Sequence, residues 1–262
     1  GIFVGFFTGL LGVGGGFILV PVLYFILLRM GVEPTIAIRM AFGTSLAIII
    51  PTAISSTHAH YRKNQVEVKA ALYMGISGFI GAILGGYIAT HVPGEYLRLL
   101  FAIVLLFAAF RMLLFKEPEE YGAKIENILF FLIVGFFTGM ISGLAGVGGG
   151  IILIPVMVLI LGFNMKEAGG TSSLVIVLTS LGGIFSYIIN GLYVTGLPAY
   201  SLGYVNVLQF FIIVISSIPM AQVGAWASHK FSDKILRYFF IILLTYIALK
   251  MLGVYGWLGL PL

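Results

Sequence analysis

The 262-residue chain contains no cysteine and few charged residues. The absence of thiols excludes disulfides, cysteine-based metal sites and thiol catalysis. Charged side chains make up 9% of the sequence, against about 25% in a typical soluble domain, so they could not cover a water-exposed surface. The net charge of +5 comes from basic residues dispersed between apolar stretches. This dispersal excludes a nucleic-acid-binding protein and is typical of residues that set membrane topology.

Apolar residues, by contrast, are abundant in the sequence. They make up 60% of the chain, and the mean hydropathy is +1.15. A helix needs about 20 apolar residues to cross a hydrocarbon core of ~30 Å. The segments that satisfy this length are roughly 38–57, 68–91, 96–115, 168–190, 204–228 and 235–256. The sequence therefore predicts an all-α polytopic protein, and we expect it to span the cell (inner or plasma) membrane several times.

Glycine is abundant, and many of the 35 glycines form two matching ladders. The first ladder comprises Gly1, Gly5, Gly9, Gly12, Gly14, Gly15 and Gly16, and it is followed by Pro21. Each of these positions recurs 134 residues later, over 135–150 and at Pro155. Because a glycine inside a helix costs about 1 kcal/mol relative to alanine, both ladders predict a helix break. A helix broken at matching places in two halves of a membrane protein points to a substrate site.

The duplication divides the chain into two halves. A charged stretch over 116–124 is the only real linker between them. We therefore predict an N-terminal transmembrane repeat over 1–115, a cytoplasmic linker over 116–126 and a C-terminal transmembrane repeat over 127–262. The chain starts without methionine and already inside an apolar segment, so we expect further residues upstream.

The ladder segments, about 2–28 and 127–161, either cross the membrane once as kinked helices or dip in and return as two half-helices. Half-helices over about 2–11 and 17–28 would each be about 15–18 Å long, close to half the hydrocarbon thickness. The crossing model divides the 14 basic residues equally between the two sides. The re-entrant model leaves only Arg29, Arg39, Arg98 and Lys250 on the outer side. Only this second division obeys the positive-inside rule.

The re-entrant model gives each repeat a broken helix pair plus three transmembrane helices. Because three is odd, the second repeat must lie inverted relative to the first. Inverted repeats are common in secondary transporters, whose binding site lies near the midplane where the repeats meet. The loops over 57–69 and 116–126 would then be cytoplasmic.

The triple glycines predict a binding site for a small anion. The first N–H groups of a helix lack internal partners and carry a partial positive charge, and glycine lets a ligand approach them closely. The residues predicted to form this site are Gly14, Gly15, Gly16 and Phe17 in the first copy and Gly148, Gly149, Gly150 and Ile151 in the second. The alternative is that glycine serves helix packing, which we prefer for Gly81, Gly85 and the spaced glycines of both ladders.

Hydroxyl side chains follow each ladder near the start of the next apolar segment. They are Thr44 and Ser45 in the first repeat and Thr171, Ser172 and Ser173 in the second. Hydroxyls can donate to an oxyanion without placing a charge in the membrane. Such residues also commonly bond to their own helix backbone, and both alternatives stay open, with the recurrence in both repeats favouring substrate binding.

Charged residues at membrane depth are few. No aspartate or glutamate falls within a predicted crossing, which argues against carboxylate relays. Arg39 either faces an anion path or extends to the membrane interface. His58 could titrate near neutral pH and serve coupling, whereas its spacing from His60 argues against a metal site. We predict no metal and no cofactor.

The sequence contains no complete motif of a soluble enzyme. The sequence at 12–17 lacks the last glycine of a dinucleotide fingerprint, and no phosphate-loop lysine follows either ladder. Ser142 has no histidine in a later apolar segment that could serve it as a base. We therefore expect no enzymatic activity.

The two ladders resemble those of the TauE/SafE sulfite exporter family (the TSUP group). The resemblance lies in Gly-Leu-Leu-Gly-Val-Gly-Gly-Gly-Phe-Ile-Leu-Val-Pro at 9–21 and Gly-Leu-Ala-Gly-Val-Gly-Gly-Gly-Ile-Ile-Leu-Ile-Pro at 143–155. Thr44-Ser45-Leu46 and Ser172-Ser173-Leu174 also fit, and the resemblance spans nearly the whole chain. It implies a small permease, often an exporter, for anionic sulfur compounds such as sulfite, sulfoacetate and related organosulfonates.

Taken together, these patterns predict a secondary transporter that holds a small oxyanion between two re-entrant loops and releases it by alternating access. The alternatives are a permease for another small anion such as a carboxylate, a non-transporting membrane subunit, and a channel. The expected partners are a small anionic substrate and the lipid bilayer. Coupling to protons or Na+ and assembly as a homodimer both stay open.

Overall fold

A computed structural model describes residues 2, 6, 15–114, 127–228 and 233–253. Within this part of the chain there are nine helices and one short β-hairpin. The helices are α2 (Gly16–Arg29), α3 (Pro34–Tyr61), α4 (Val68–His91), α5 (Gly94–Leu114), α6 (Ile128–Ala145), α7 (Gly150–Leu159), α8 (Met165–Gly191), α9 (Val207–Ser228) and α10 (Asp233–Met251). The hairpin consists of β1 (Ser201–Leu202) and β2 (Val205–Asn206).

The helical membrane class predicted from the sequence is confirmed. By length and composition, α3, α4, α5, α6 and α8 could each cross a membrane. The span predicted over 68–91 coincides with α4, and most other boundaries differ by only a few residues. α3 starts earlier than predicted because Pro34 suits the first turn of a helix and the Glu33 side chain accepts a 2.9 Å bond from the Ile36 N–H.

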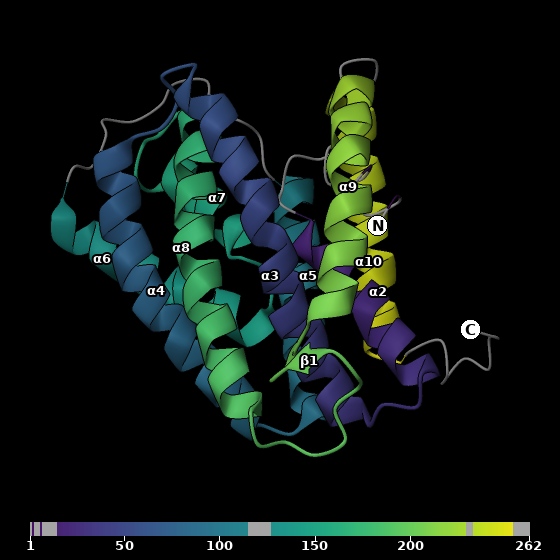
Figure 1. Cartoon of the computed structure of the whole chain (residues 1–262). Helices are drawn as coiled ribbons and strands as arrows, with labels where there is room; N and C mark the ends of the chain where they lie inside the picture. Colours follow the sequence, from purple (N-terminus) through teal and green to yellow (C-terminus); the bar gives the residue numbers. More distant parts are fainter. Residues whose placement is uncertain (1, 3–5, 7–14, 115–126, 229–232, 254–262) are drawn as a thin grey trace.

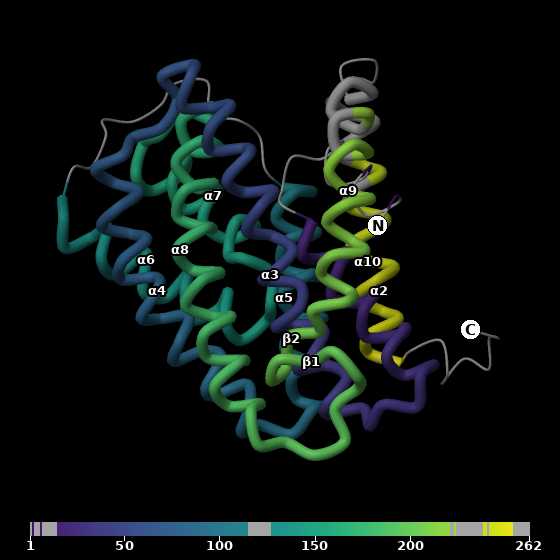
Figure 2. The backbone as a smooth tube through the Cα atoms, viewed as in Figure 1, coloured from purple at the N-terminus to yellow at the C-terminus, as the bar shows by residue number. Residues whose placement is uncertain are grey.

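The segment predicted over roughly 204–228 becomes helical three residues later than predicted, at Val207. The chain first forms the β1–β2 hairpin, in which Ser201 pairs with Asn206 and Leu202 with Val205. Gly203 has a φ of 58° at its turn. Helix α9 begins only at Val207, where the Asn206 side chain accepts a 2.9 Å bond from the Gln209 N–H. Figure 2 shows the hairpin tucked in beside α3 rather than lying outside the bundle.

The helices form two groups that meet at α3 (Figure 1). On one side lie α4, α6 and α8, and on the other lie α2, α9 and α10. α3 and α8 run in opposite directions, because Gly43 near the start of α3 packs on Tyr187 near the end of α8. The start of α5 lies beside the end of α10, where Arg98 Nε donates to the Met251 carbonyl at 3.1 Å. Inverted repeats require such opposed pairs, and the inverted arrangement itself stays a prediction.

The second ladder forms a hairpin that enters and leaves at one end of the bundle. Both α6 and α8 run parallel to α4, because Gly135 packs near Met74 and Gly143 near Ala82, while Gly182 packs near Phe79. Both helices therefore begin where α4 begins. α6 has 18 residues and α7 has 10, about 27 Å and 15 Å of helix. Thus α6 is longer than the half-helix that the sequence predicts, while α7 has the expected length.

Glycine brings the backbones of α4 and α6 into direct contact. A Cβ atom added to Gly139 would collide with the Gly78 backbone, and one added to Gly81 would collide with the Phe136 carbonyl. A stripe of small residues allows such close approach between membrane helices. The packing role predicted for Gly81, Gly85 and the 135–143 glycines is confirmed, whereas Gly1, Gly5 and Gly9 lie outside the described residues.

Two Gly→Ala substitutions should change stability in opposite directions. Gly139→Ala should destabilise the protein by about 1–3 kcal/mol, because the new methyl group overpacks the α4–α6 contact. Gly169→Ala on α8 should be neutral or stabilising, because nothing lies within 4 Å of its Cβ position and alanine favours the helix. Thermal unfolding of the detergent-purified variants measures both effects. Equal shifts for the two variants would contradict the backbone contact.

Candidate anion site at the two helix breaks

Both helix breaks depend on a glycine in the left-handed conformation. Gly15 has a φ of 69° and Gly149 a φ of 84°, and each immediately precedes the first residue of its helix. A residue with a side chain rarely adopts this backbone conformation. The helices begin at Gly16 and Gly150, one residue earlier than the predicted starts at Phe17 and Ile151. Gly14 lies outside the described residues.

The start of α7 presents N–H groups that the helix itself does not use, those of Gly150 and Ile151. In α7 the first internal bonds run from the Ile152 and Leu153 N–H groups to the Gly149 carbonyl, at 3.1 and 3.0 Å. In α2 the Ile18 and Leu19 N–H groups bond to the Gly15 carbonyl in the same way, both at 3.0 Å. The N–H groups that precede these donors carry the partial positive charge of a helix N-terminus.

The two breaks lie against each other in the interior of the protein. A Cβ atom added to Gly16 would lie 2.9 Å from the Val147 Cα, within the second ladder. Ile49 of α3 packs near both Gly16 and Gly148, and Ile176 of α8 packs near Gly148. Gly15, Gly16 and residues 145–150 are all buried. The sequence prediction that the two triple-glycine runs face one another is therefore supported for the described part of these runs.

α8 holds the second break in place. The Tyr187 hydroxyl donates to the Gly143 carbonyl at 2.8 Å, and the Thr179 hydroxyl shares its proton between the Gly148 carbonyl at 3.3 Å and the Ile176 carbonyl of its own helix at 3.1 Å. The two bonds to ladder carbonyls satisfy backbone oxygens that the interrupted helix leaves without a helical partner. They also hold the second ladder against α8 at two positions, Gly143 and Gly148. The break is thus a supported structure and not a loose turn.

Buried serine hydroxyls near the breaks have no hydrogen-bond partner within the described residues. Ser45 and Ser180 are fully buried, Ser142 is 1% exposed, and the Oγ atom of each is unpaired. Ser45 lies one helical turn from Phe42 and Ile49, which contact Gly146 and Gly148. A Cβ on Gly149 would lie 3.4 Å from the Ser142 Cβ. Ser45 and Ser142 are therefore placed to donate to a ligand at the breaks.

Only Ser45 among these serines was predicted as a site residue. Ser142 sits inside the first helix of its ladder segment, and Ser180 sits nine residues beyond Thr171 in α8. Neither belongs to the Thr-Ser-Leu motif, but Ser142 lies 134 residues after Thr8, so the ladder repeat does place a hydroxyl at this position in both copies. A signal that could have found Ser142 is its position one turn before Gly146, where α6 ends.

Thr44 and Thr171 make matching bonds across the two predicted repeats. The Asn206 N–H, directly before α9, donates to the Thr44 hydroxyl at 2.9 Å. The Glu67 N–H, directly before α4, donates to the Thr171 hydroxyl at 2.9 Å. Both threonines are fully buried. Each hydroxyl thus accepts a bond from the start of a helix in the other repeat, a structural role that neither sequence alternative anticipated.

Ser172 and Ser173 bond to their own helix. Both hydroxyls donate to the Gly169 carbonyl, at 3.0 and 2.8 Å, and the Ser173 hydroxyl also lies 2.9 Å from that of Ser56. For these two residues the structure favours the alternative that serine hydroxyls bond to the backbone of their own helix. They lie four and three residues before Ile176, about one helical turn from the side chain that contacts the second break, and their substrate role stays a prediction.

Arg39 connects to the breaks through two tyrosines. Its guanidinium donates to the Tyr204 hydroxyl and to the Val92 carbonyl, each at 3.1 Å, while its buried Nε has no partner in the described part of the chain. The Tyr204 ring packs edge-on against Tyr187 with centroids 6.4 Å apart, and Tyr187 bonds to Gly143. Arg39 is half-buried, and its bond to Val92 places one end of the guanidinium beside the end of α4, so both the anion path and the membrane interface stay predictions for this residue. His58 is exposed near the end of α3, away from this group.

The fold and these contacts define a multi-pass helical membrane protein with two buried helix breaks. The family described as Sulfite exporter TauE/SafE matches residues 1–251. The chain belongs to this family of membrane transporters.

Relatives of similar length bear transporter names. A probable membrane transporter protein of Haemophilus influenzae is 30% identical over 251 residues, which cover 96% of this chain and 95% of the relative. A probable membrane transporter protein of Methanocaldococcus jannaschii is 31% identical over 256 residues, covering 96% and 94%. No solved structure matches the chain.

Removing the two threonine hydroxyls should destabilise the protein unequally. Thr44→Val leaves the Asn206 N–H buried without an acceptor and should cost about 1–3 kcal/mol. Thr171→Val should cost less, because Glu67 is exposed and its N–H can bond to water. Thr57→Val is the matched control, since that hydroxyl only donates to the Ala53 carbonyl of its own helix. Thermal unfolding tests the order, and a Thr44→Val variant as stable as the control would contradict it.

Proposed function

We propose that this protein is a secondary transporter of small sulfur-containing oxyanions, such as sulfite or organosulfonates, in the cell membrane. The observation that carries the proposal is the meeting of two helix starts beside buried, unpaired serine hydroxyls. Membership of the sulfite exporter family agrees with this ligand class.

The chemistry of the site favours an anion over a cation. An oxyanion offers only hydrogen-bond acceptors, so a site for it must supply donors. Helix N-termini supply N–H donors and positive potential, and Ser45 and Ser142 supply O–H donors. No carboxylate is among the described residues that surround the two breaks. A cation at this place would meet the wrong end of both helix dipoles.

The donors are neutral, which suits transport. A fixed arginine or lysine beside the ligand would bind an anion strongly and would also be costly to keep at membrane depth. Partial charges and hydroxyls bind it more weakly, so the anion can leave on the other side. The glycines contribute by letting the anion reach the backbone, because no side chain covers the N–H groups.

The helix arrangement supports alternating access. The opposed pairs α3–α8 and α5–α10 are those that inverted repeats produce, and transporters of this plan rock one repeat against the other around a fixed site. The cross-repeat bonds of Thr44 and Thr171 would keep the two halves in register during such a movement.

Transport by purified protein in liposomes tests the function directly. We expect saturable uptake of labelled sulfite or an organosulfonate. Uptake that rises linearly with concentration would indicate a channel. Transport of a carboxylate or another oxyanion, without sulfite or sulfonates, would indicate a different permease. If the protein moves no labelled anion, it is a non-transporting subunit and the proposal is wrong.

Serine variants test the site with little disturbance of the fold. Ser45→Ala and Ser142→Ala should each weaken substrate binding about tenfold or more, because a hydrogen bond to a charged group contributes about 1.5–3 kcal/mol. The KM for uptake should rise while the unfolding temperature stays within about a degree. Ser216→Ala on α9 is the control, because its hydroxyl donates only to carbonyls of its own helix.

Glycine variants test the helix breaks more drastically. Gly15→Leu and Gly149→Leu place a side chain on a left-handed residue and cover the N–H groups, so we expect them to abolish uptake. Unchanged transport in both glycine variants and in both serine variants would refute the site.

A further inference from the structure

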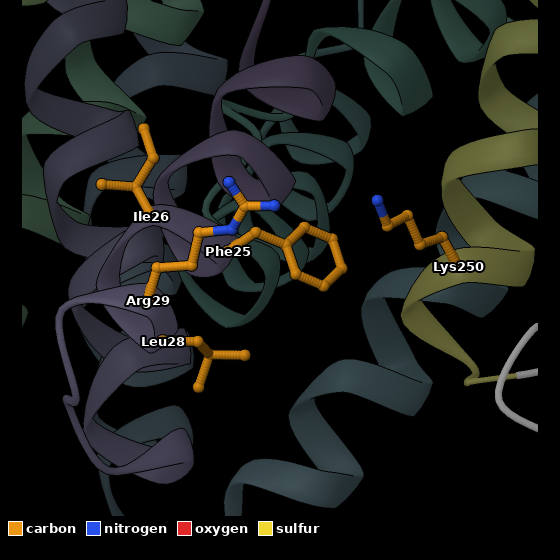
Figure 3. Close-up of a pocket in the computed structure, with 5 residues that line it drawn as sticks. All are labelled: Phe25, Ile26, Leu28, Arg29 and Lys250. Carbon is orange, nitrogen blue, oxygen red and sulfur yellow. The ribbon is translucent and has the colours of Figure 1, made fainter. Parts of the chain in front are cut away.

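A pocket distant from the helix breaks contains two basic side chains. It has a volume of about 340 Å3 and is lined by Phe25, Ile26, Leu28, Arg29 and Lys250. Arg29 lies in the last turn of α2 and Lys250 in the last turn of α10. In Figure 3 both charged groups point toward the space beside the Phe25 ring. The Lys250 Nζ lies 4.7 Å from the centre of that ring.

No negative charge in the described chain balances this pair. Its described lining contains no carboxylate, so two cations share one pocket without a counter-ion from the protein lining. Like charges held close together destabilise one another unless an anion lies between them. Arg29 is exposed, so water can solvate its charge, and the two cations on one pocket create a positive potential that favours an external anion.

Helix capping does not account for the two cations. At the end of α10, Arg98 already donates to the Met251 carbonyl at 3.1 Å and to the Tyr24 hydroxyl at 3.4 Å. At the end of α2, the Gly31 and Val32 N–H groups bond to the Leu28 and Leu27 carbonyls, at 3.0 and 3.1 Å. The carbonyls of both helix ends thus have other donors. Arg29 and Lys250 are free to bind something else.

The apolar surroundings distinguish a lipid from a free anion. Val22, Ile26 and Met30 follow one another at four-residue spacing along α2, and they are 38%, 44% and 60% exposed. Ile26 belongs both to this stripe and to the pocket lining. A ligand with a charged head and a hydrocarbon tail would fill the pocket and cover the stripe together.

We propose that Arg29 and Lys250 bind the phosphate group of an anionic phospholipid, whose acyl chain lies along the Val22–Ile26–Met30 stripe. Basic pockets between transmembrane helices bind lipid head groups on the cytoplasmic side of membranes, and the same attraction between cations and phosphate applies here, where the arginine fork suits phosphate oxygens. Under the topology predicted from the basic residues, this lipid belongs to the outer leaflet. The lipid would hold α2 and α10 together at the end where neither helix contributes an acidic group.

Native mass spectrometry of detergent-purified protein tests the proposal. We expect the wild type to retain phosphatidylglycerol in preference to phosphatidylcholine. The double variant Arg29→Gln/Lys250→Gln should bind phosphatidylglycerol roughly 30-fold more weakly. The double variant Arg62→Gln/Lys63→Gln, which removes two exposed cations at the opposite end of α3, should bind like the wild type. Equal weakening in both double variants would overturn the proposal.

Two further measurements separate the sources of the anion and guard against misfolding. Inorganic phosphate should displace the lipid only at millimolar concentrations, and displacement at micromolar concentrations would show a site for a free anion instead. Lys250→Arg keeps the charge and should retain the lipid. Loss of binding in Lys250→Arg with an unchanged unfolding temperature would also overturn the proposal, because binding would then not depend on the paired positive charges.

Discussion

Hydrocarbon offers no hydrogen bonds, so an interrupted helix must satisfy its backbone groups from within the protein. The structure meets this requirement at the second break with Thr179 and Tyr187, which donate to the carbonyls of Gly148 and Gly143. On the N–H side of this break, the Gly150 and Ile151 N–H groups precede the first donors of α7, and the buried Ser142 lies close to Gly149. This imbalance between satisfied carbonyls and available N–H groups is what makes the break suitable for an anion.

The sequence predicted the helical membrane class, the second break and the contact of this break with the start of α2, because a doubled glycine motif in apolar surroundings has few other physical meanings. It could not predict the role of Thr44 and Thr171. Their partners, the Asn206 and Glu67 N–H groups, lie 162 and 104 residues away in the chain. From the sequence, each hydroxyl could bond either to a substrate or to the backbone of its own helix. In the structure, each instead accepts a bond from a backbone N–H group that the fold brings close.

The β-hairpin before α9 was missed for a related reason. Residues 201–206 read as the start of an apolar segment, and only the left-handed Gly203 and the capping bond of Asn206 separate them from the helix. Their position is set by distant contacts, since Gly203 and Tyr204 pack on the end of α8 and Tyr204 binds Arg39. Apolar composition could locate this segment in the membrane protein but not decide its conformation.

The glycine contact between α4 and α6 limits how the protein can move. Side chains between two helices can change rotamer and let the helices slide, but a backbone resting on a backbone has no such freedom. Gly78, Gly81, Gly139 and their neighbours therefore join α4 and α6 into one rigid body. Gly182 of α8 meets the Phe79 backbone of α4 in the same way, so any opening of the central site must be taken up at α3, which contacts Gly183 of α8 through the Leu46 side chain.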